Sequence, residues 1–483
     1  MRNSTCSRLD PGRALASLCL LCVVGGVLGS VAGCGEDESL ANVRDFNVAL
    51  IVLDTTRADA VEGYADGRAH TPTLAKLAAE GVLFRNARTT SAWTLPSHGS
   101  LFTSLYPSRH GAHSEGTGLD PKRTTLPELL SKTHDSAAFS ENPHIVAARG
   151  FARGFEHFDE TWREQEDLAV PPPTEQRIAE WFKGRDASKP FFLFVNLMTP
   201  HLPYTPPRAL EERFVPKLDR KIIDNFRSIE EGHARMQMMG SLGLGRLDFS
   251  ILRALYRAEV SYVDQRLQDI LDLIGGASVL DRTLVVVVGD HGENIGHHGL
   301  MEHQFCLYES LLRVPMIMRL PAVLPRGLVR DEPVQLVDVM PTILDVLEWP
   351  RDQWPAMEGR SLLGQPVPMD RPVYAETMRP DGQQALFHAI DPEFDFTPFL
   401  RRLKSIQVEN LKLIVPEPGE RELYDISKDP AERINLATQY PAEADRLEAQ
   451  LLDWARQLEP GQSKPAELDP QTREALRKLG YAE

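Results

Sequence analysis

The tetrapeptide Asp290-His291-Gly292-Glu293 places a carboxylate beside an imidazole, directly after an apolar run. Both side chains can reach one divalent cation if the backbone turns sharply, and Gly292 permits such a turn. Asp54 ends an earlier apolar run, where a buried carboxylate is costly without a cation or a hydrogen-bonded partner. Each residue alone could belong to a turn or a helix cap. Together, Asp54, Asp290 and His291 predict a site for one divalent metal ion.

A hydroxyl residue stands at the expected start of a helix, in Thr94-Leu95-Pro96-Ser97-His98. Threonine followed closely by proline before an apolar stretch is typical of a helix N-terminus, with Thr94 as the cap. Free backbone N–H groups and the helix dipole at this place suit an anionic ester under attack. Metal coordination would make the hydroxyl nucleophilic. A purely structural cap is the alternative interpretation.

Three continuous apolar runs must position these residues, at 48–54, 191–198 and 284–290. Such runs predict strands buried on both faces, and helical segments at 73–79 and 252–274 alternate with them. The pattern predicts an α/β fold with a mostly parallel sheet between helices. Sites in such sheets form at the carboxyl ends of the strands. We therefore expect Asp54, the turn Thr199-Pro200-His201 and Asp290-His291 to meet in one crevice.

Changes in amino-acid composition and hydrophobic pattern divide the chain into four parts. Residues 1–33 are basic and then uncharged, typical of a secretory signal, and the ending at Cys34 resembles a bacterial lipobox. A plain signal peptide or a single membrane anchor is the alternative. Residues 34–45 are expected to form an acidic tether and residues 46–369 a catalytic α/β domain, with a helical excursion at 208–250. Residues 370–483 are expected to form a smaller α+β subdomain with a helical tail. This division predicts an exported protein, lipid-anchored at the bacterial cell envelope.

The charge and the cysteines narrow the possible partners. A formal net charge of −16 makes nucleic acid or an anionic membrane surface an unsuitable general partner. Contact with a membrane is expected only through a lipid on Cys34, and an anionic substrate needs a local positive site. Cysteines 6, 19 and 22 lie in the leader, which leaves only Cys34 and Cys306. Stability is thus expected to come from the core and a metal, without disulfides.

A series of blocks between residues 47 and 436 resembles the sulfatase family, within the alkaline phosphatase superfamily, in the same order. NVALIVLDTTRAD is similar to the family's first strand and metal ligand, and HTPTLAKLAAEGVLFRNA to its first helix. TLPSHGSLFTSLYPSRHG stands where the family keeps Cys-x-Pro-Ser-Arg. The later blocks include PFFLFVNLMTPHLPY, VVVVGDHGE and ELYDISKDPAERINLA. The resemblance implies the same fold, with a smaller C-terminal subdomain.

The resemblance also implies roles for single residues. Asp54, Asp290 and His291 match metal ligands, and Thr94 matches the nucleophile. His201 and His303 match residues that contact the anionic group or the leaving oxygen, although each could be a buried hydrogen-bonding histidine; Asn142 is a weaker candidate. The implied cofactor is one divalent ion, also bound by the Thr94 hydroxyl. Imidazole beside oxygen suits Mn, Zn or Mg, and the family resemblance adds Ca.

The departures from the family pattern bear on the chemistry. Thr94 cannot be oxidised to formylglycine, as the family's cysteine is, and His98, a further catalytic candidate, replaces the motif's arginine. Thr55 stands where many sulfatases have a second aspartate, and the Lys-x-His pattern is missing around residues 140–144. A threonine nucleophile resembles the phosphoethanolamine transferases and lipoteichoic acid synthases of the same superfamily. These features favour hydrolysis of a phosphate ester over a sulfate ester.

The expected substrate is an anionic ester, either small or linked to a glycan or lipid. Two other functions stay open. One is transfer of a phospho-head group at the cell envelope, although such transferases usually carry a multi-helix membrane region. The other is a binding protein that has kept the fold and lost catalysis. Fold by itself does not settle this choice.

Overall fold

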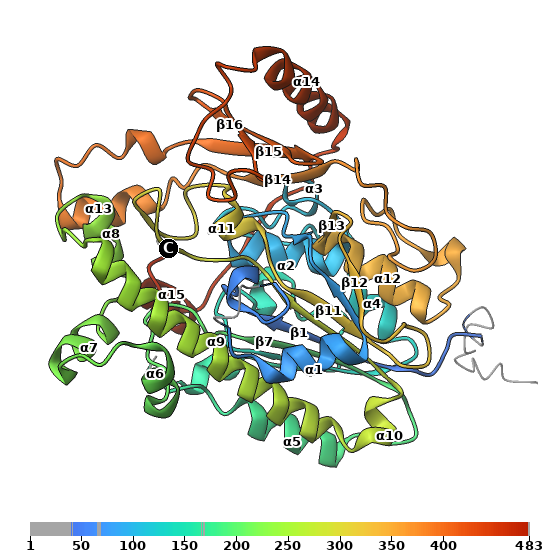
Figure 1. Cartoon of the computed structure of the whole chain (residues 1–483). Helices are drawn as coiled ribbons and strands as arrows, with labels where there is room; N and C mark the ends of the chain where they lie inside the picture. The colour runs from blue at the N-terminus through green and yellow to red at the C-terminus, as the bar shows by residue number, and fades with distance from the viewer. Residues whose placement is uncertain (1–39, 41, 65–68, 166, 168–169, 482–483) are drawn as a thin grey trace, which may run out of the picture. The chain divides into compact units, whose positions relative to one another are not determined.

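The computed structural model describes residues 40, 42–64, 69–165, 167 and 170–481 (Figure 1). The expected signal peptide, Cys34 and most of the expected tether lie outside these residues. In the described part, no helix is both long and apolar enough to cross a membrane. Contacts group the chain from Asn42 onward into one compact unit.

An eight-stranded sheet forms the centre of this unit, in the order β12-β2-β11-β8-β1-β7-β5-β6. The three apolar runs form β1 (Asn47–Leu53), β7 (Phe191–Leu197) and β8 (Thr283–Gly289), and β1 lies between the other two in parallel register. All three are almost completely buried, as continuous apolar runs require.

The outer strands complete the sheet. On one side, β5 (Asp135–Ser140) and β6 (His157–Asp159) continue the parallel arrangement. On the other side, β11 (Met316–Arg319) runs antiparallel to both β8 and β2 (Val82–Phe84), and β12 (Leu328–Arg330) pairs in parallel with β2. The expectation of a mostly parallel α/β sheet is confirmed.

Helices cover both faces of the sheet (Figure 1). On one face lie α1 (Pro72–Glu80), α5 (Thr174–Gly184) and α9 (Arg246–Ile274), and on the other α2 (Thr94–Thr103) and α12 (Val339–Val346). The long helix α9 begins six residues before the expected start, because the Asp248 carboxylate accepts the Gly245 backbone N–H and caps it. The expected excursion is helical, with α6 (Arg208–Phe214), α7 (Arg220–Arg227) and α8 (Glu231–Met238).

The C-terminal part contains a second sheet, which is antiparallel. Its strands are β14 (Val373–Thr377), β15 (Arg402–Val408), β16 (Leu411–Glu417) and β17 (Glu422–Asp425), and α14 (Pro441–Gln457) packs against it. The chain then returns to the larger part: β18 (Lys464–Pro465) pairs with β4 (Thr117–Gly118), and α15 (Pro470–Lys478) follows. This return was not expected from the sequence.

Short elements connect these parts. They are β3 (Ala87–Arg88), α3 (Pro107–His110), α4 (Leu126–Leu130), α10 (Ala277–Leu280), β9 (Asn294–His297), β10 (Leu300–Glu302), α11 (Glu309–Leu312), β13 (Val334–Gln335) and α13 (Gln383–Ile390). The β9–β10 hairpin directly follows the Asp290-His291 turn, so it carries further polar residues toward the carboxyl end of β8.

Candidate active site

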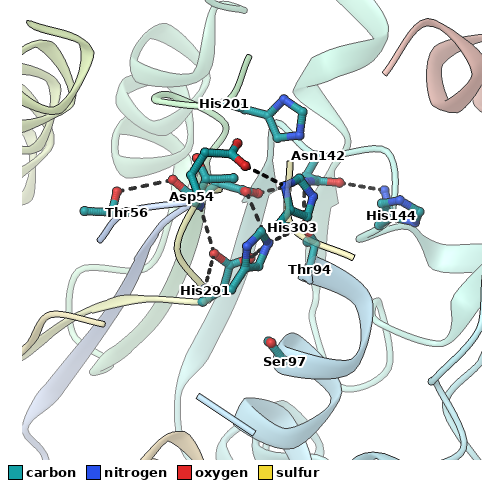
Figure 2. A network of polar contacts seen from close by, with 12 residues as sticks. Asp54, Thr56, Thr94, Ser97, Asn142, His144, His201, His291 and His303 are labelled. Carbon is teal, nitrogen blue, oxygen red and sulfur yellow. Dashed lines mark hydrogen bonds and ion pairs between the residues drawn. The ribbon is translucent and has the colours of Figure 1, made fainter. Parts of the chain in front are cut away.

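The carboxyl ends of β1 and β8 bring two carboxylates together, and Figure 2 shows one of them, Asp54, beside His291. Leu53 and Gly289 are register partners in these parallel strands, and Asp54 and Asp290 are the next residues along each strand. The side chains of Asp54, Asp290 and His291 each offer one ligand atom, and these atoms lie within 4.8 Å of one another. The sheet thus assembles the three residues that the sequence singled out.

The surroundings of these three side chains fit a bound cation. Asp54 Oδ1 and Asp290 Oδ2 are buried without a hydrogen-bond partner in the described protein. His291 Nε2 lies 3.4 Å from Asp290 Oδ2 and 3.8 Å from Asp54 Oδ1. The other ring nitrogen, Nδ1, is 2.9 Å from the Gly292 carbonyl oxygen and donates its N–H to it. The lone pair of the ring therefore lies on Nε2. Two oxygens and one nitrogen therefore face a common point.

Burial without a cation has a clear electrostatic effect on these groups. It raises the pKa of Asp54 to about 7 and the pKa of Asp290 well above its usual range. It also lowers the pKa of His291 well below its usual value. A divalent cation would offset the unfavourable free energy of burying two charged carboxylates side by side. The donor set, with imidazole beside carboxylates, suits a divalent ion.

The backbone around the two carboxylates is unusual at two positions. Thr55 adopts a left-handed conformation with φ of 48°, and its N–H donates to Asp290 Oδ1 over 3.1 Å. Gly292 was expected to permit a sharp turn, but its backbone φ angle is not positive. Its requirement is steric instead, because a Cβ there would lie 2.0 Å from the Ser310 carbonyl oxygen. Both residues hold the Asp290-His291 turn close to neighbouring backbone.

Thr94 lies beside this centre at the start of α2. Its Oγ1 is 3.2 Å from His291 Nε2 and 3.4 Å from Asn142 Nδ2. Thr94 was expected to be the cap, but the cap position belongs to Trp93 and Thr94 is the first helical residue. No side chain caps the helix. The hydroxyl therefore points to the candidate metal ligands and away from the helix backbone.

His98 lies one turn farther along α2 and behind Thr94. Its Nδ1 is 3.0 Å from the Thr94 carbonyl oxygen, and its Nε2 is 3.4 Å from Asn196 Nδ2. Burial lowers the pKa of His98 to about 4, so the ring is neutral at neutral pH. Both ring nitrogens have protein partners. His98 Nδ1 also lies 3.6 Å from Asp290 Oδ2. This geometry suits a residue that positions Thr94, and the catalytic role expected for His98 stays a prediction.

His201 lies across the centre from α2, and His303 lies between His201 and His291 (Figure 2). The His303 ring is 4.5 Å from the His291 ring and 5.3 Å from the His201 ring. His201 Nδ1 is 2.8 Å from the Leu202 carbonyl oxygen, whereas Nε2 is buried without a partner. Burial lowers the pKa of both His201 and His303 to about 4. The structure thus brings both histidines to the expected site.

The loop after β5 contributes two side chains to the site. Asn142 Nδ2 donates to Asp54 Oδ2 over 2.7 Å, and Asn142 Oδ1 accepts the His144 backbone N–H over 2.8 Å. Both ring nitrogens of His144 are buried without a partner. His144 was not among the sequence candidates. The signal was present, because Asn142-Pro143-His144 keeps the final histidine of the Lys-x-His pattern.

Tyr481 also reaches the site, and nothing in the sequence pointed to it. Its hydroxyl lies 2.8 Å from His303 Nε2, and the other nitrogen of that ring, Nδ1, lies 3.4 Å from Glu293 Oε1. The described centre therefore contains three candidate metal ligands, the Thr94 hydroxyl, the Asn142 amide, four further histidines and the phenol of Tyr481. Such a set can bind an anionic ester, supply an oxygen nucleophile and exchange protons.

Comparison with known proteins relates the chain to sulfatases and their relatives by sequence and by fold. A family model described as Sulfatase matches residues 47–348, more than half of the chain. A second model, described as N-sulphoglucosamine sulphohydrolase, C-terminal, matches residues 296–458. The multifunctional alkaline phosphatase superfamily protein PehA of Trinickia caryophylli is 27% identical over 489 residues, which cover 81% of this chain and 91% of PehA.

Two solved structures share the fold, each with a TM-score of 0.68. The phosphonate monoester hydrolase of Agrobacterium radiobacter is 21% identical, and the match covers 88% of this chain and 98% of that one. The second structure is a complex with its substrate, D-glucosamine-2-N,6-O-disulfate; it is 19% identical, with coverage of 87% and 100%.

Proposed function

The chain belongs to the sulfatase family and is a hydrolase acting on ester bonds, and we propose that it prefers phosphate esters to sulfate esters, with Thr94 as nucleophile. The observation that carries the proposal is the Thr94 hydroxyl, 3.2 Å from His291 Nε2, at the position of the family's formylglycine cysteine. Among the described residues the one free cysteine is Cys306, which is buried with Asn294 Nδ2 3.4 Å from its sulfur. A threonine hydroxyl can form a phosphate ester without any such oxidation.

Asp54, Asp290 and His291 would hold one divalent cation, Mn, Zn, Mg or Ca, and Thr94 Oγ1 would lie beside it. When bound, the cation would lower the pKa of the threonine hydroxyl and offset the negative charge of the ester. The two unpartnered carboxylate oxygens support this assignment. Thr55 and Asn142 occupy the remaining carboxylate oxygens through N–H groups, which fixes both carboxylates in place.

In the proposed reaction, Thr94 Oγ1 attacks the phosphorus of the ester. The bond from Oγ1 to phosphorus forms while the bond from phosphorus to the alcohol oxygen breaks; Oγ1 loses its proton as the alcohol oxygen gains one, so the step neither consumes nor releases protons overall. Water then cleaves the threonine ester, releases phosphate and restores the hydroxyl. Asn142 Nδ2, which is 3.4 Å from Oγ1, orients the nucleophile by donating to it.

His201 is the proposed proton carrier for the alcohol oxygen. His201 Nδ1 donates its N–H to the Leu202 carbonyl oxygen, so the lone pair lies on Nε2, which is free to accept a proton. Burial holds the pKa of His201 at about 4 before the ester arrives. The negative charge of a bound ester raises this pKa, so the ring can become protonated and donate to the alcohol oxygen.

The proposed substrate is an anionic ester that is small or linked to a glycan or lipid. Two relatives support this class: one acts on a phosphonate monoester and another binds a sulfated glucosamine. The proposed location is the bacterial cell envelope, through a lipid on Cys34, and it is supported by the sequence of residues 1–34 alone. Mass spectrometry of the mature N-terminus tests this location, since an unmodified Cys34 would contradict it.

The test of the proposed function is nitrophenol release by a protein that begins at Glu36. Phosphate monoester, phosphate diester and sulfate ester substrates are compared with added Mn, Zn, Mg or Ca. We expect turnover of a phosphate ester, and we expect Thr94→Ala to lower kcat by about 10³-fold or more because the nucleophile is lost. Thr94→Ser is the matched control, since it keeps a hydroxyl at the same place and should retain activity.

Each other outcome has a distinct meaning. Preference for the sulfate ester with full activity of Thr94→Ala would leave Thr94 a structural residue and overturn the mechanism. Absence of turnover on all esters would favour the two alternatives, a phospho-head-group transferase or a binding protein.

A further inference from the structure

Tyr481 fills a place between four side chains of the site. Its ring stacks on Trp93 at 6.2 Å between centroids and meets the His144 ring edge-on at 4.1 Å. Its hydroxyl lies 2.8 Å from His303 Nε2, and Gln304 also forms a hydrogen bond with it. Only 2% of Tyr481 is exposed. The phenol thus occupies a defined slot with an aromatic wall and two polar contacts.

The residues behind this slot are closed to solvent. Thr94, Asp54, Asp290 and His291 are all 0% exposed. An ester therefore cannot reach Thr94 in this conformation without displacement of a covering group.

A cavity of about 350 Å³ lies on the outer side of the slot. Its lining includes Trp93 and Gln304, the two outer neighbours of Tyr481, together with polar residues of the segments 113–116 and 377–382. Neither Thr94 nor the metal-binding residues line this cavity. Tyr481 contacts the cavity wall on one side and His303 on the other, so it separates the cavity from the reaction centre.

Leu468, Leu479 and Tyr481, on either side of α15, are buried, but the helix itself packs loosely. Within α15 only Thr472 and Leu476 are buried, and a cavity of about 130 Å³ remains between this helix and Trp162 and Met198. At its start, Asp469 pairs with Arg163 through side chains that are about half and one-third exposed. Exposed ion pairs and few buried apolar groups are typical of segments that open at low cost.

Gly480 seats the segment against the protein. Its carbonyl oxygen accepts from Arg235 Nη2 over 2.6 Å and from Gln383 Nε2 over 3.2 Å. Its φ of +80° is strained for any residue with a side chain. A Cβ at Gly480 would lie 2.3 Å from Arg235 Nη2 and 2.9 Å from Glu231 Cβ. The closed position therefore requires glycine here.

We propose that Tyr481 is a gate that determines which esters reach Thr94, and that a ring in the alcohol portion of the substrate displaces its phenol. The substrate ring takes the slot between Trp93 and His144, and the ester's alcohol oxygen takes the contact with His303. An aromatic or sugar ring has the flat face that this slot accommodates. The ring-bearing ester is taken from the proposed function, whereas the gating role of Tyr481 can be tested by ligand binding alone.

The test measures the association rate constant of inorganic phosphate with the metal-loaded full-length protein, by stopped-flow tryptophan fluorescence. Tyr481→Ala removes the covering ring and should raise the rate constant at least tenfold. Gly480→Ala leaves Tyr481 unchanged but unseats it, and should raise the rate constant similarly. The matched controls are Tyr440→Ala, at an exposed tyrosine, and Gly240→Ala, at a glycine with φ of +76° and nothing within 4 Å. Both controls should stay within twofold of the wild type.

Tyr481→Phe separates the ring from its hydroxyl. Loss of the hydroxyl and its contacts with His303 and Gln304 should raise the rate constant less than Tyr481→Ala does, because the ring still covers the site. Turnover of ring-bearing and methyl phosphate esters completes the test. We expect Tyr481→Ala to lower KM more for the methyl ester, which has no ring to displace the phenol.

The outcomes distinguish the gate from the proposed function. Unchanged association rate constants in both Tyr481→Ala and Gly480→Ala would overturn the gate. Absence of phosphate binding in every variant would also overturn it, because the gate would then cover no anion site. Faster phosphate binding without turnover of any ester would support the gate and refute the proposed hydrolysis.

Discussion

Replacement of Asn142 by alanine should weaken metal binding at the centre. Asn142 Nδ2 donates to Asp54 Oδ2 over 2.7 Å, and both residues are buried. A hydrogen bond to a charged group contributes about 1.5–3 kcal/mol, which corresponds to roughly 10–100-fold in affinity. Asn196 also forms a hydrogen bond with Asp54, so the carboxylate keeps one side-chain partner in Asn142→Ala. We therefore expect the lower end of this range, an increase of about tenfold in the Kd for the divalent ion.

The assay is a calorimetric titration of the metal-free protein with Mn²⁺. Asn225→Ala, at an exposed asparagine on α7, is the control and should leave the Kd unchanged. The loop after β5 also loses the bond from the His144 N–H to Asn142 Oδ1, so thermal unfolding is measured in parallel to confirm that the variant is folded. A Kd within twofold of the wild type in a folded Asn142→Ala would refute the reasoning that this amide orients a metal ligand.

Two further predictions concern a buried acid and a glycine. Burial raises the pKa of Glu259 to about 8, so its contribution to stability is fully present below pH 4.5 and is lost as the pH rises through 8. Glu259→Gln should thus increase the free energy of unfolding at pH 9 by about a few kcal/mol. Glu212→Gln, at an exposed glutamate, is the control and should leave it unchanged. Equal denaturant midpoints of Glu259→Gln and the wild type at pH 9 would contradict the prediction. Gly292→Ala places a Cβ 2.0 Å from the Ser310 carbonyl oxygen and should cost about 1–3 kcal/mol of stability together with metal binding. Gly299→Ala, at a glycine with φ of +76° and open space around it, is the control, and equal metal affinity of the two variants would show that the turn tolerates the side chain.

The sequence predicted the three central strands and the candidate metal ligands because the relevant signals are local. An apolar run that ends in a carboxylate marks both the strand and the position of its last side chain. Parallel strands place their carboxyl ends together, so Asp54 and Asp290 were expected to meet, and in the structure they do. The threonine–proline pattern placed Thr94 at the start of a helix, and the family resemblance placed it near them.

Single side-chain roles were less predictable. His98 is a catalytic candidate because it occupies a motif position; the structure adds that it reaches back from four positions later in the helix to the Thr94 carbonyl oxygen. Gly292 was associated with a sharp turn, whereas its close approach to Ser310 depends on α11 lying against the turn. His144 was overlooked because its motif had lost the preceding lysine.

The sequence by itself thus determined the strands, the order of the family blocks and the residue types available for a metal ion and a nucleophile. The tertiary structure alone decided that Asn142 supports Asp54 and that Tyr481 covers His303 and the centre. The physical reason is sequence distance: Tyr481 and His303 are 178 residues apart, and no periodicity links them. Their contact depends on how α15 returns from the second sheet, and only the packed chain determines that path.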